Sequence, residues 1–293
     1  MELRELRYFL AVAEEQSITR AAERLYIAQP SLSRQMQNLE KEVGSPLLVR
    51  GGRKIGLTET GKLLRKRAQE LLELYEKTEA ELTAPRTEVS GDVYIGGGES
   101  YAVRTVAAVA KTVRDRFPGI RFHFFSGDAP AVLEKLDKGL LDFGVLIDAP
   151  ALSGYDALPL PLSDRWGVLM RRDSPLAAHG SIRPEDLAGQ PLVCSDQSVA
   201  KGLVAGWLGI PPEQMCVAAT YNLLYVASEL VAEGFGYAVG LDGIIATDGE
   251  RELCFRPLEP ALETRLDVVW KKHQVFSPAG AKFLEALRAS LAR

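Results

Sequence analysis

The sequence predicts an α+β chain of more than one domain, with a mostly α-helical N-terminal part, a long connecting helix and a C-terminal α/β part. Residues 17–42 place apolar side chains at helical spacing in two stretches separated by a three-residue break. Residues 57–82 continue one apolar seam in steps of four and three residues. From residue 92 onward, short apolar strands alternate with helices, as in α/β sheet proteins. The length of 293 residues agrees with about two domains.

The composition is that of a soluble globular protein, since 46% of the residues are hydrophobic and 25% are charged. The N-terminus carries charges from the start, so no secretory signal is expected, and no apolar run approaches the length of a membrane span. Cys194, Cys216 and Cys254 are odd in number and lie among apolar residues, which favours a reducing compartment over a disulfide framework. These features predict a cytoplasmic protein with no membrane partner.

Charge is distributed unevenly along the chain. The net charge is −4 overall, yet residues 20–54 carry seven Lys or Arg against three Glu. Residues 1–90 have a net charge of +1, and the remainder has −5. One basic segment in an acidic chain indicates a confined nucleic-acid contact and argues against a general coat of positive charge.

Three helices are predicted at the N-terminus. The first has an apolar face made of Leu3, Leu6, Phe9, Leu10 and Ala13. Ser17 is expected to cap a second helix of about eight residues, and Pro30 to take the first position of a third. Four residues of the third helix share its buried face: Leu32, Met36, Leu39 and Val43.

The outer face of the third helix has a chemistry suited to reading DNA. It presents Pro30, Ser33, Arg34, Gln37 and Lys41. In the major groove Arg can bond to guanine and Gln to adenine, and serines are short enough to let the helix approach. The alternative is an ordinary solvated helix pair, because polar outer faces are the rule.

A short hairpin is predicted next, with strands at Pro46–Arg50 and Arg53–Leu57 and a turn at Gly51-Gly52. It is similar to the wing of a winged helix-turn-helix, so residues 1–58 are interpreted as that domain. Its cations would contact phosphate or the minor groove. The DNA-binding residues predicted in this way are Gln29, Pro30, Ser31, Ser33, Arg34 and Gln37 for base reading, and Arg50, Arg53, Lys54 and Thr58 for the backbone.

A long helix should follow, capped by Thr58 and continuing to about Leu82. Its seam is Leu57, Gly61, Leu64, Ala68, Leu71, Tyr75, Thr78 and Leu82. A helix of about 36 Å with one apolar side needs a partner, most simply the same helix of a second copy. The predicted dimerisation residues are Leu64, Ala68, Leu71, Tyr75 and Leu82. Pro85 and the polar residues after it predict a hinge, so residues 59–90 are interpreted as linker.

The C-terminal part alternates strands and helices. Strands are predicted at residues 92–97, 120–125, 142–147, 166–171, 191–194, 215–221, 236–241, 253–258 and 265–270. Helices are predicted at residues 101–117, 130–138, 198–208, 223–233 and 278–291. The sequence shows no internal repeat and no segment of low complexity.

Several segments together resemble the LysR-type transcriptional regulators. The N-terminal ones begin at Leu6 (LRYFLAVA), Ser17 (SITRAAERL), Gln29 (QPSLSRQ), Leu39 (LEKEVG) and Leu57 (LTETG). The C-terminal ones begin at Arg116 (RFPGI), Leu136 (LDKGLLDFG) and Val231 (VAEGFG). The resemblance covers essentially the whole chain.

The resemblance implies a two-lobed C-terminal domain like that of periplasmic solute-binding proteins, over residues 91–293. Lobe I would hold about 91–161 and 266–293, and lobe II about 162–265. It also implies a small-molecule effector in the cleft, a homodimer or homotetramer on double-stranded promoter DNA, and RNA polymerase as a further partner of an activator. No cofactor is expected.

Four strand-to-helix junctions are candidates for the effector site, because free N–H groups and the helix dipole converge at such places. Their residues are Gly98, Glu99 and Ser100; Ser126, Gly127 and Asp128; Ser195, Asp196 and Gln197; and Asn222. Alternatively, Ser100, Asp128, Ser198 and Asn222 could simply be helix caps.

Two of these junctions carry acids. Members of the family commonly bind carboxylate effectors through hydroxyls and backbone N–H groups at the first two junctions. Glu99 and Asp128 stand there in this sequence, which argues against a simple anionic effector. We therefore expect an effector with a donor or cationic group that these acids accept.

Other classes of function find less support. His123, His179 and His273 lack the spacing of metal ligands, Gly96-Gly97-Gly98 lacks the lysine of a phosphate-binding loop, and no nucleophile elbow is present. An enzyme would need such a constellation, and a transport solute-binding protein would not explain the N-terminal helices. A redox switch at Cys194 and Cys216, as in peroxide-sensing members of the family, is less common than burial.

Overall fold

The computed structural model describes residues 1–51, 54–83, 89–148, 153–247 and 252–292. The chain separates into two compact units, residues 1–84 and residues 85–293. Each unit has its own buried apolar clusters and is described separately.

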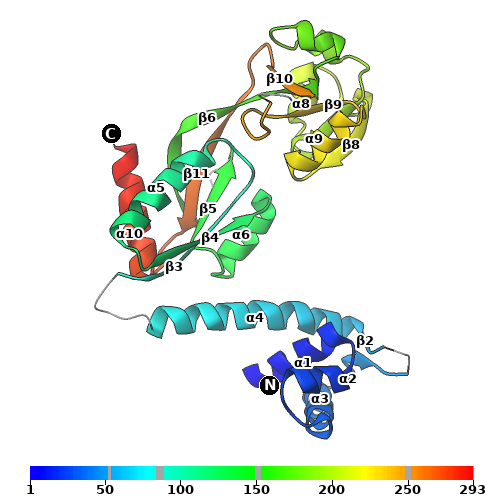
Figure 1. Ribbon diagram of the computed structural model, residues 1–293, viewed down its shortest axis with the longest axis vertical. Coiled ribbons are helices and arrows are strands. Elements are labelled where there is room, and N and C mark those ends of the chain that lie inside the picture. Colours follow the sequence, from blue (N-terminus) through cyan, green and yellow to red (C-terminus); the bar gives the residue numbers. More distant parts are fainter. Residues whose placement is uncertain (52–53, 84–88, 149–152, 248–251, 293) are drawn as a thin grey trace. The chain divides into compact units, whose positions relative to one another are not determined.

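The N-terminal unit is built from α1 (Leu3–Glu15), α2 (Ile18–Arg24) and α3 (Gln29–Val43), which lie beside the N-terminal half of a long helix (Figure 1). Ser17 caps α2 as predicted, with its Oγ accepting from the Arg20 N–H at 3.3 Å. The buried residues that join the three helices include Phe9, Ala21 and Leu32. The three predicted helices are confirmed.

Two details of α3 differ from the prediction. Gln29 takes the first position of the helix, and Pro30 the second. Leu32, Met36 and Leu39 are buried as expected, but Val43 is 38% exposed. Val43 is the last residue of the helix before the Gly44 cap, where the chain turns away from the core.

The predicted hairpin consists of β1 (Leu48–Val49) and β2 (Gly56–Leu57), which pair antiparallel. Its tip falls at residues 52–53, so the predicted contact of Arg53 lies outside the described residues. The next helix, α4 (Glu59–Thr83), approaches the hairpin closely at Gly61. A Cβ on Gly61 would lie 2.1 Å from the Leu47 carbonyl oxygen, so only glycine fits at this position.

The apolar seam of α4 is divided between two surfaces. Leu64, Ala68 and Leu72 pack against α1, where Leu6 is their buried partner, and Ala68 has no exposed surface. The later seam residues remain open, since Leu71 is 45% exposed and Leu82 is 81% exposed. Ala68 therefore serves its own subunit and is not available to a second copy.

The C-terminal unit contains a sheet in the order β4-β3-β5-β11-β6-β9-β7-β8, with β10 paired to β6. Its strands are β3 (Gly91–Gly97), β4 (Ile120–Ser126), β5 (Phe143–Ile147), β6 (Tyr155–Arg171), β7 (Leu192–Ser195), β8 (Val217–Tyr221), β9 (Tyr237–Leu241), β10 (Leu253–Pro257) and β11 (Glu263–Lys271). Its helices are α5 (Val103–Arg116), α6 (Ala129–Asp137), α7 (Asp196–Ala200), α8 (Leu203–Leu208), α9 (Leu224–Ala232) and α10 (Pro278–Leu291). Short 3-10 turns lie at Pro175–Ala178, Pro184–Leu187 and Pro212–Gln214.

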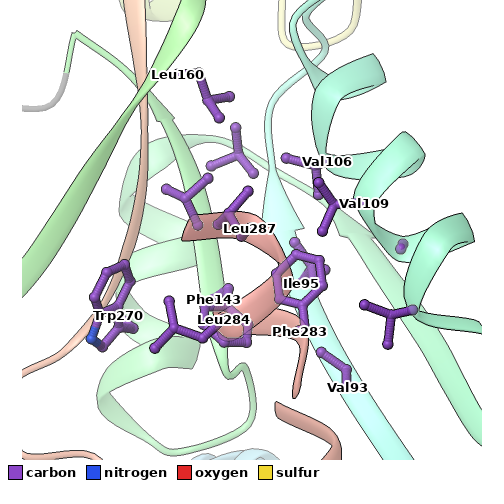
Figure 2. Close-up of a cluster of buried hydrophobic side chains, with 14 of the residues drawn as sticks. Val93, Ile95, Val106, Val109, Phe143, Leu160, Trp270, Phe283, Leu284 and Leu287 are labelled. Carbon is purple, nitrogen blue, oxygen red and sulfur yellow. The ribbon is translucent and has the colours of Figure 1, made fainter. Parts of the chain in front are cut away.

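β6 and β11 run between two groups of elements (Figure 1). The first half of β6 pairs with β11, and its last residues pair with β9 and β10. Each group has its own core. In the first core, side chains of β3, β5, α5 and α10 point toward one another, among them Val93, Val106, Phe143 and Phe283 (Figure 2). The second core includes Trp166, Val168 and Val239.

Two elements of this unit differ from the prediction. The strand predicted at residues 166–171 is only the end of β6, which begins at Tyr155. Pro159 and Pro161 made the first half of β6 hard to predict as a strand, because proline cannot donate a hydrogen bond to a neighbouring strand. Proline is tolerated in a strand where the strand has a neighbour on one side only. The helix predicted at residues 198–208 is divided into α7 and α8 by Gly202, which has a φ of 63°.

Candidate DNA-binding surface and effector site

The outer face of α3 is open. Gln29, Pro30, Ser31, Arg34 and Gln37 are exposed, and Ser33 is half-buried. Ala28, the residue before the helix, provides no side-chain cap. Within the described part of the chain, Arg34 has no hydrogen-bond or ion-pair partner, so its guanidinium group is available to an acceptor outside the protein.

The arginines of the neighbouring helix α2 are already paired. Arg24 on α2 donates to Glu14 at 2.6 Å and lies 3.4 Å from Glu15. The hydrogen bond to Glu14 raises the pKa of Arg24. Pairing within the subunit reduces the ability of α2 to attract phosphate, whereas Arg34 on the adjoining helix keeps a charge that is unpaired among the described residues.

The base of the hairpin is held to α3 by Glu40. Its Oε1 accepts from the backbone N–H groups of Leu47 and Leu48, at 2.9 and 3.0 Å. Its Oε2 accepts from Arg50 at 2.8 Å. Arg50, which was predicted to contact phosphate, therefore forms an ion pair with Glu40 in the chain without DNA, although its side chain is 43% exposed.

The other predicted backbone contacts lie around the same hairpin. Thr58 is half-buried, donates its hydroxyl to the Pro46 carbonyl at 2.7 Å and accepts from the Gly61 N–H at 3.0 Å. Thr58 caps α4 as predicted, and its hydroxyl proton is already donated to the Pro46 carbonyl. Lys54 is exposed beside the hairpin tip.

Tyr26 is a further candidate for contact with DNA, and the sequence analysis did not single it out. It lies in the turn between α2 and α3, has a φ of 54° and is 95% exposed. The sequence reasoning treated residues 26–28 only as a break between helices. The signal was a bulky aromatic side chain in a short break between two helices, where glycine, asparagine or aspartate is more usual.

In the C-terminal unit, the four predicted junctions come together in two pairs. β3 and β4 are parallel, Gly97 is paired with Ser126, and the Gly127 N–H donates to the Gly97 carbonyl at 3.0 Å. β7 and β8 are also parallel, and their last paired residues are Ser195 and Tyr221. Adjacent parallel strands therefore place each pair of junctions at one edge of the sheet.

Glu99 links the two pairs of junctions. Its Oε2 accepts from the backbone N–H of Leu224, the first residue of α9, at 2.6 Å. The carboxylate therefore satisfies one of the free N–H groups at the start of that helix. Gly98 and Ser100 flank this contact in the chain, and Asn222 precedes the helix as an exposed residue.

Some of the predicted site residues are helix caps. Asp128 accepts from the Ala131 N–H at 2.9 Å and caps α6. Ser195 accepts from the Ser198 N–H at 3.1 Å and caps α7, which also contains Asp196 and Gln197. Ser100 accepts from the Ala102 N–H at 3.0 Å but is not the cap of α5, since Ala102 holds that position. Asn222 is not a cap, since Leu223 holds that position for α9.

Asp164 is a further acid that the sequence reasoning missed. It lies on β6, is only 3% exposed, and its Oδ1 accepts from the Ala102 N–H at 3.3 Å. Burial raises the pKa of this carboxyl, and Asp242 raises it further, while the Ser100 hydroxyl and the Ala102 N–H lower it. Asp164 was missed because it lies in the half of β6 that the sequence did not show as a strand.

The cysteines and histidines do not form a reactive site in the described residues. Cys194 and Cys254 are buried as expected, but Cys216 is exposed. Burial raises the pKa of the Cys194 thiol to about 11, so that it remains a protonated and poorly reactive thiol at neutral pH. No group of three or more metal-ligating side chains occurs among the described residues. Within the same residues, every helix is too short or too polar to span a membrane.

Two protein families match the chain. The family described as "Bacterial regulatory helix-turn-helix protein, lysR family" matches residues 3–62. The family described as "LysR substrate binding domain" matches residues 86–292. The first match lies within the N-terminal unit and the second within the C-terminal unit.

Known proteins resemble the chain over nearly its whole length. The Hca operon transcriptional activator HcaR of Escherichia coli strain K12 is 31% identical over 301 residues, which cover 100% of this chain and 99% of HcaR. The regulator BsdA of Bacillus subtilis strain 168 is 34% identical over 253 residues, covering 82% of this chain and 83% of BsdA.

Solved structures share the fold. CbnR, crystallised with its target DNA, has a TM-score of 0.77 at 21% identity and covers 99% of this chain and 100% of its own. Full-length BenM has a TM-score of 0.57 at 26% identity, and the match covers 100% of this chain and 97% of the BenM chain. The chain therefore belongs to the LysR family of DNA-binding transcriptional regulators, which join a helix-turn-helix domain to an effector-binding domain, and it is not an enzyme.

Proposed function

We propose that α3 reads base edges in promoter DNA while the hairpin positions the protein on the backbone. The observation that supports this most is the open face of α3, on which Arg34 is exposed and unpaired among the described residues. Gln29, Pro30, Ser31, Ser33 and Gln37 lie on or beside that face. Arg50, Arg53, Lys54 and Thr58 would fix the register through phosphates.

Two copies of the chain would be joined through α4. Leu71, Tyr75 and Leu82 are exposed, at 45%, 38% and 81%, although their side chains are apolar or aromatic. Leu64 is half-buried against α1, and Ala68 is inaccessible, so the dimer contact shifts to the later turns of the helix. A homodimer, or a homotetramer made of two dimers, places two α3 helices on one duplex.

A small-molecule effector would bind between lobe I, about residues 91–161 and 266–293, and lobe II, about residues 162–265. The contact between Glu99 and the Leu224 N–H supports this, because it joins the strand-to-helix junctions of the two groups of elements. Gly98, Ser100, Ser126, Gly127 and Asp128 lie on one side, and Ser195, Asp196, Gln197 and Asn222 on the other.

Regulation follows if the effector binds one arrangement of the lobes more tightly than another. The lobes would then change how the effector-binding domains pack and how far apart the α3 helices lie. RNA polymerase would be a further partner where the promoter is activated. Such a protein would act in the cytoplasm.

Footprinting of the full chain on DNA upstream of its own gene tests the proposal. We expect a protected site with approximate two-fold symmetry and a steep fall of affinity with added salt, because several phosphates are neutralised. Protection that does not differ from that of a scrambled duplex would contradict it.

A further inference from the structure

A group of buried polar side chains, here called the polar layer, lies on β6 and β11 between residues of the two cores of the C-terminal unit. Along β6, Leu160 belongs to the first core and Trp166 to the second, and Asp164 lies between them. Along β11, Leu266 belongs to the first core, and the buried Thr264 lies two residues before it. Asp164 and Thr264 are direct partners across the two strands, so their side chains share one face of the sheet.

Three buried polar atoms of this layer have no hydrogen-bond partner in the described part of the chain. They are Asp164 Oδ2, Thr264 Oγ1 and Trp166 Nε1. The three residues are 3%, 1% and 7% exposed. Buried polar groups are almost always paired, and each unpaired one costs free energy. Three such atoms on two adjacent strands mark this part of the sheet as a candidate ligand site.

The unpaired atoms also indicate what binds there. Asp164 Oδ2 is an acceptor, Trp166 Nε1 is only a donor, and Thr264 Oγ1 can be either. The neighbours that act on Asp164 are the Ser100 hydroxyl, the Ala102 N–H and the Asp242 carboxylate, and among them there is no cation. A buried carboxylate without a cation is best satisfied by a charged donor.

Each of the two acids singled out from the sequence already accepts one backbone hydrogen bond through one of its oxygens. Glu99 accepts from the Leu224 N–H and Asp128 from the Ala131 N–H. Neither Glu99 nor Asp128 is buried like Asp164, and neither has a buried carboxylate oxygen without a hydrogen-bond partner among the described residues. We therefore assign the binding of a donor or cationic group of the effector to Asp164 on β6, and not to Glu99 or Asp128 at the junctions.

We propose that Asp164, Thr264 and Trp166 form a subsite for a small primary amine that also carries an oxygen acceptor. The ammonium group donates to Asp164 Oδ2 and Thr264 Oγ1, and the ligand oxygen accepts from Trp166 Nε1. This assignment rests on the proposed effector function of the cleft and names its ligand class. The ammonium reaches the layer when the contact between Glu99 and Leu224 opens, since Ser100 connects that contact to Asp164.

Thermal unfolding of the full chain with matched probes tests the assignment. Ethanolamine has the ammonium and the oxygen, ethylene glycol lacks the ammonium, and glycolate replaces it by a carboxylate. At equal ionic strength we expect ethanolamine to raise the Tm by about 2 °C or more over sodium chloride, because a ligand of the native state stabilises it. Ethylene glycol and glycolate should have no such effect.

Variants connect the effect to the layer. Asp164→Asn keeps the shape and removes the charge, so the ethanolamine shift should vanish. Thr264→Val should reduce it, and serves as a second test if Asp164→Asn fails to fold. Asp128→Asn is the matched control, because asparagine also caps a helix, and it should keep the full shift.

Three results would overturn the assignment: no ethanolamine shift in the unmodified chain, an equal shift in Asp164→Asn, or a shift with glycolate alone. The last of these would leave a small-molecule site in the cleft and refute only its amine specificity. Failure of the proposed regulator function has a separate signature, the loss of specific footprinting, whatever the amine does.

Discussion

Arginines of the N-terminal unit differ in what they are free to do. Arg24 and Arg50 are held by Glu14 and Glu40 at 2.6 and 2.8 Å. Arg34 has no such partner among the described residues and projects from the exposed side of α3. A guanidinium group with no internal partner loses no ion pair when it binds a guanine edge or a phosphate.

Lys54 should act as a phosphate contact without sequence preference. Replacing it with alanine removes one counterion-releasing contact, so affinity should fall alike for specific and scrambled duplexes. The slope of log affinity against log salt should become shallower by about one. Fluorescence anisotropy titrations at several salt concentrations measure both quantities. Lys111→Ala in the other unit is the control, and an effect of Lys54→Ala on one sequence alone would refute the role.

Asp164 should make the free energy of unfolding depend on pH. Burial raises the pKa of its carboxyl in the folded chain, so the folded state binds this proton more tightly than the unfolded state. Stability therefore falls as pH rises from the unfolded pKa, about 3.9, through the raised folded value. Asp164→Asn has no such proton to lose.

Thermal melts of both chains between pH 4 and pH 7 test this sign. The Tm of Asp164→Asn minus that of the unmodified chain should increase with pH, because titrating groups that do not interact with Asp164 contribute equally to both chains. A difference that decreases with pH would show that the carboxylate has a favourable partner in the folded state.

At the scale of elements, Glu40 fastens the hairpin to α3. It accepts two backbone N–H groups and pairs with Arg50, and its side chain is only 16% exposed. Glu40→Ala should destabilise the N-terminal unit by about 1.5–3 kcal/mol, the range for hydrogen bonds to a charged group. It should also weaken DNA binding, because the hairpin loses its fixed position.

Urea unfolding and DNA titration of this variant measure both effects. Glu59→Ala is a suitable control, since Glu59 is 89% exposed and pairs only with Lys62 in the described structure. Unchanged stability in Glu40→Ala would mean that the hairpin is held by its apolar contacts.

α4 should hold two subunits together through its later turns. Leu71→Glu places a charge in the proposed interface and removes the burial of one leucine, worth about 2 kcal/mol. The dimer dissociation constant should then rise at least about thirtyfold. Analytical ultracentrifugation measures it. Gln69→Glu, two residues away on a different face, should have no effect, and an unchanged dimer in Leu71→Glu would place the interface elsewhere.

Elements with a continuous pattern could be predicted from the sequence, and irregular ones could not. The spacing of Leu32, Met36 and Leu39 was sufficient to identify α3 and its buried face. Pro159 and Pro161 concealed half of β6, and Gly202 divided a helix without changing its apolar pattern. The periodicity of α4 showed one seam, but it could not show that α1 would cover Ala68.

The candidate sites follow the same rule. The exposed face of α3 is local, so its spacing predicts it. The effector residues depend on which strands lie side by side, and the sequence found the four junctions but not Asp164. Its pairing with Thr264, a hundred residues later in the chain, is a property of the sheet and leaves no local signal.

At the scale of the whole molecule, the chain combines one unit whose outer helix face is free with another that has unpaired polar atoms between two cores. Neither feature stabilises the isolated chain. Both are explained if DNA and a small molecule complete them. The two proposals can be tested separately, since DNA reading is assigned to residues of one unit and amine binding to residues of the other.

The most direct test of DNA reading by α3 is the discrimination between specific and scrambled duplexes by the full chain, with and without Arg34. At fixed salt, Arg34→Ala should lose about 1–3 kcal/mol of affinity for the footprinted site and much less for the scrambled duplex, so that discrimination falls. Full retention of discrimination by Arg34→Ala would contradict the role of α3, and base recognition would have to come from another part of the protein.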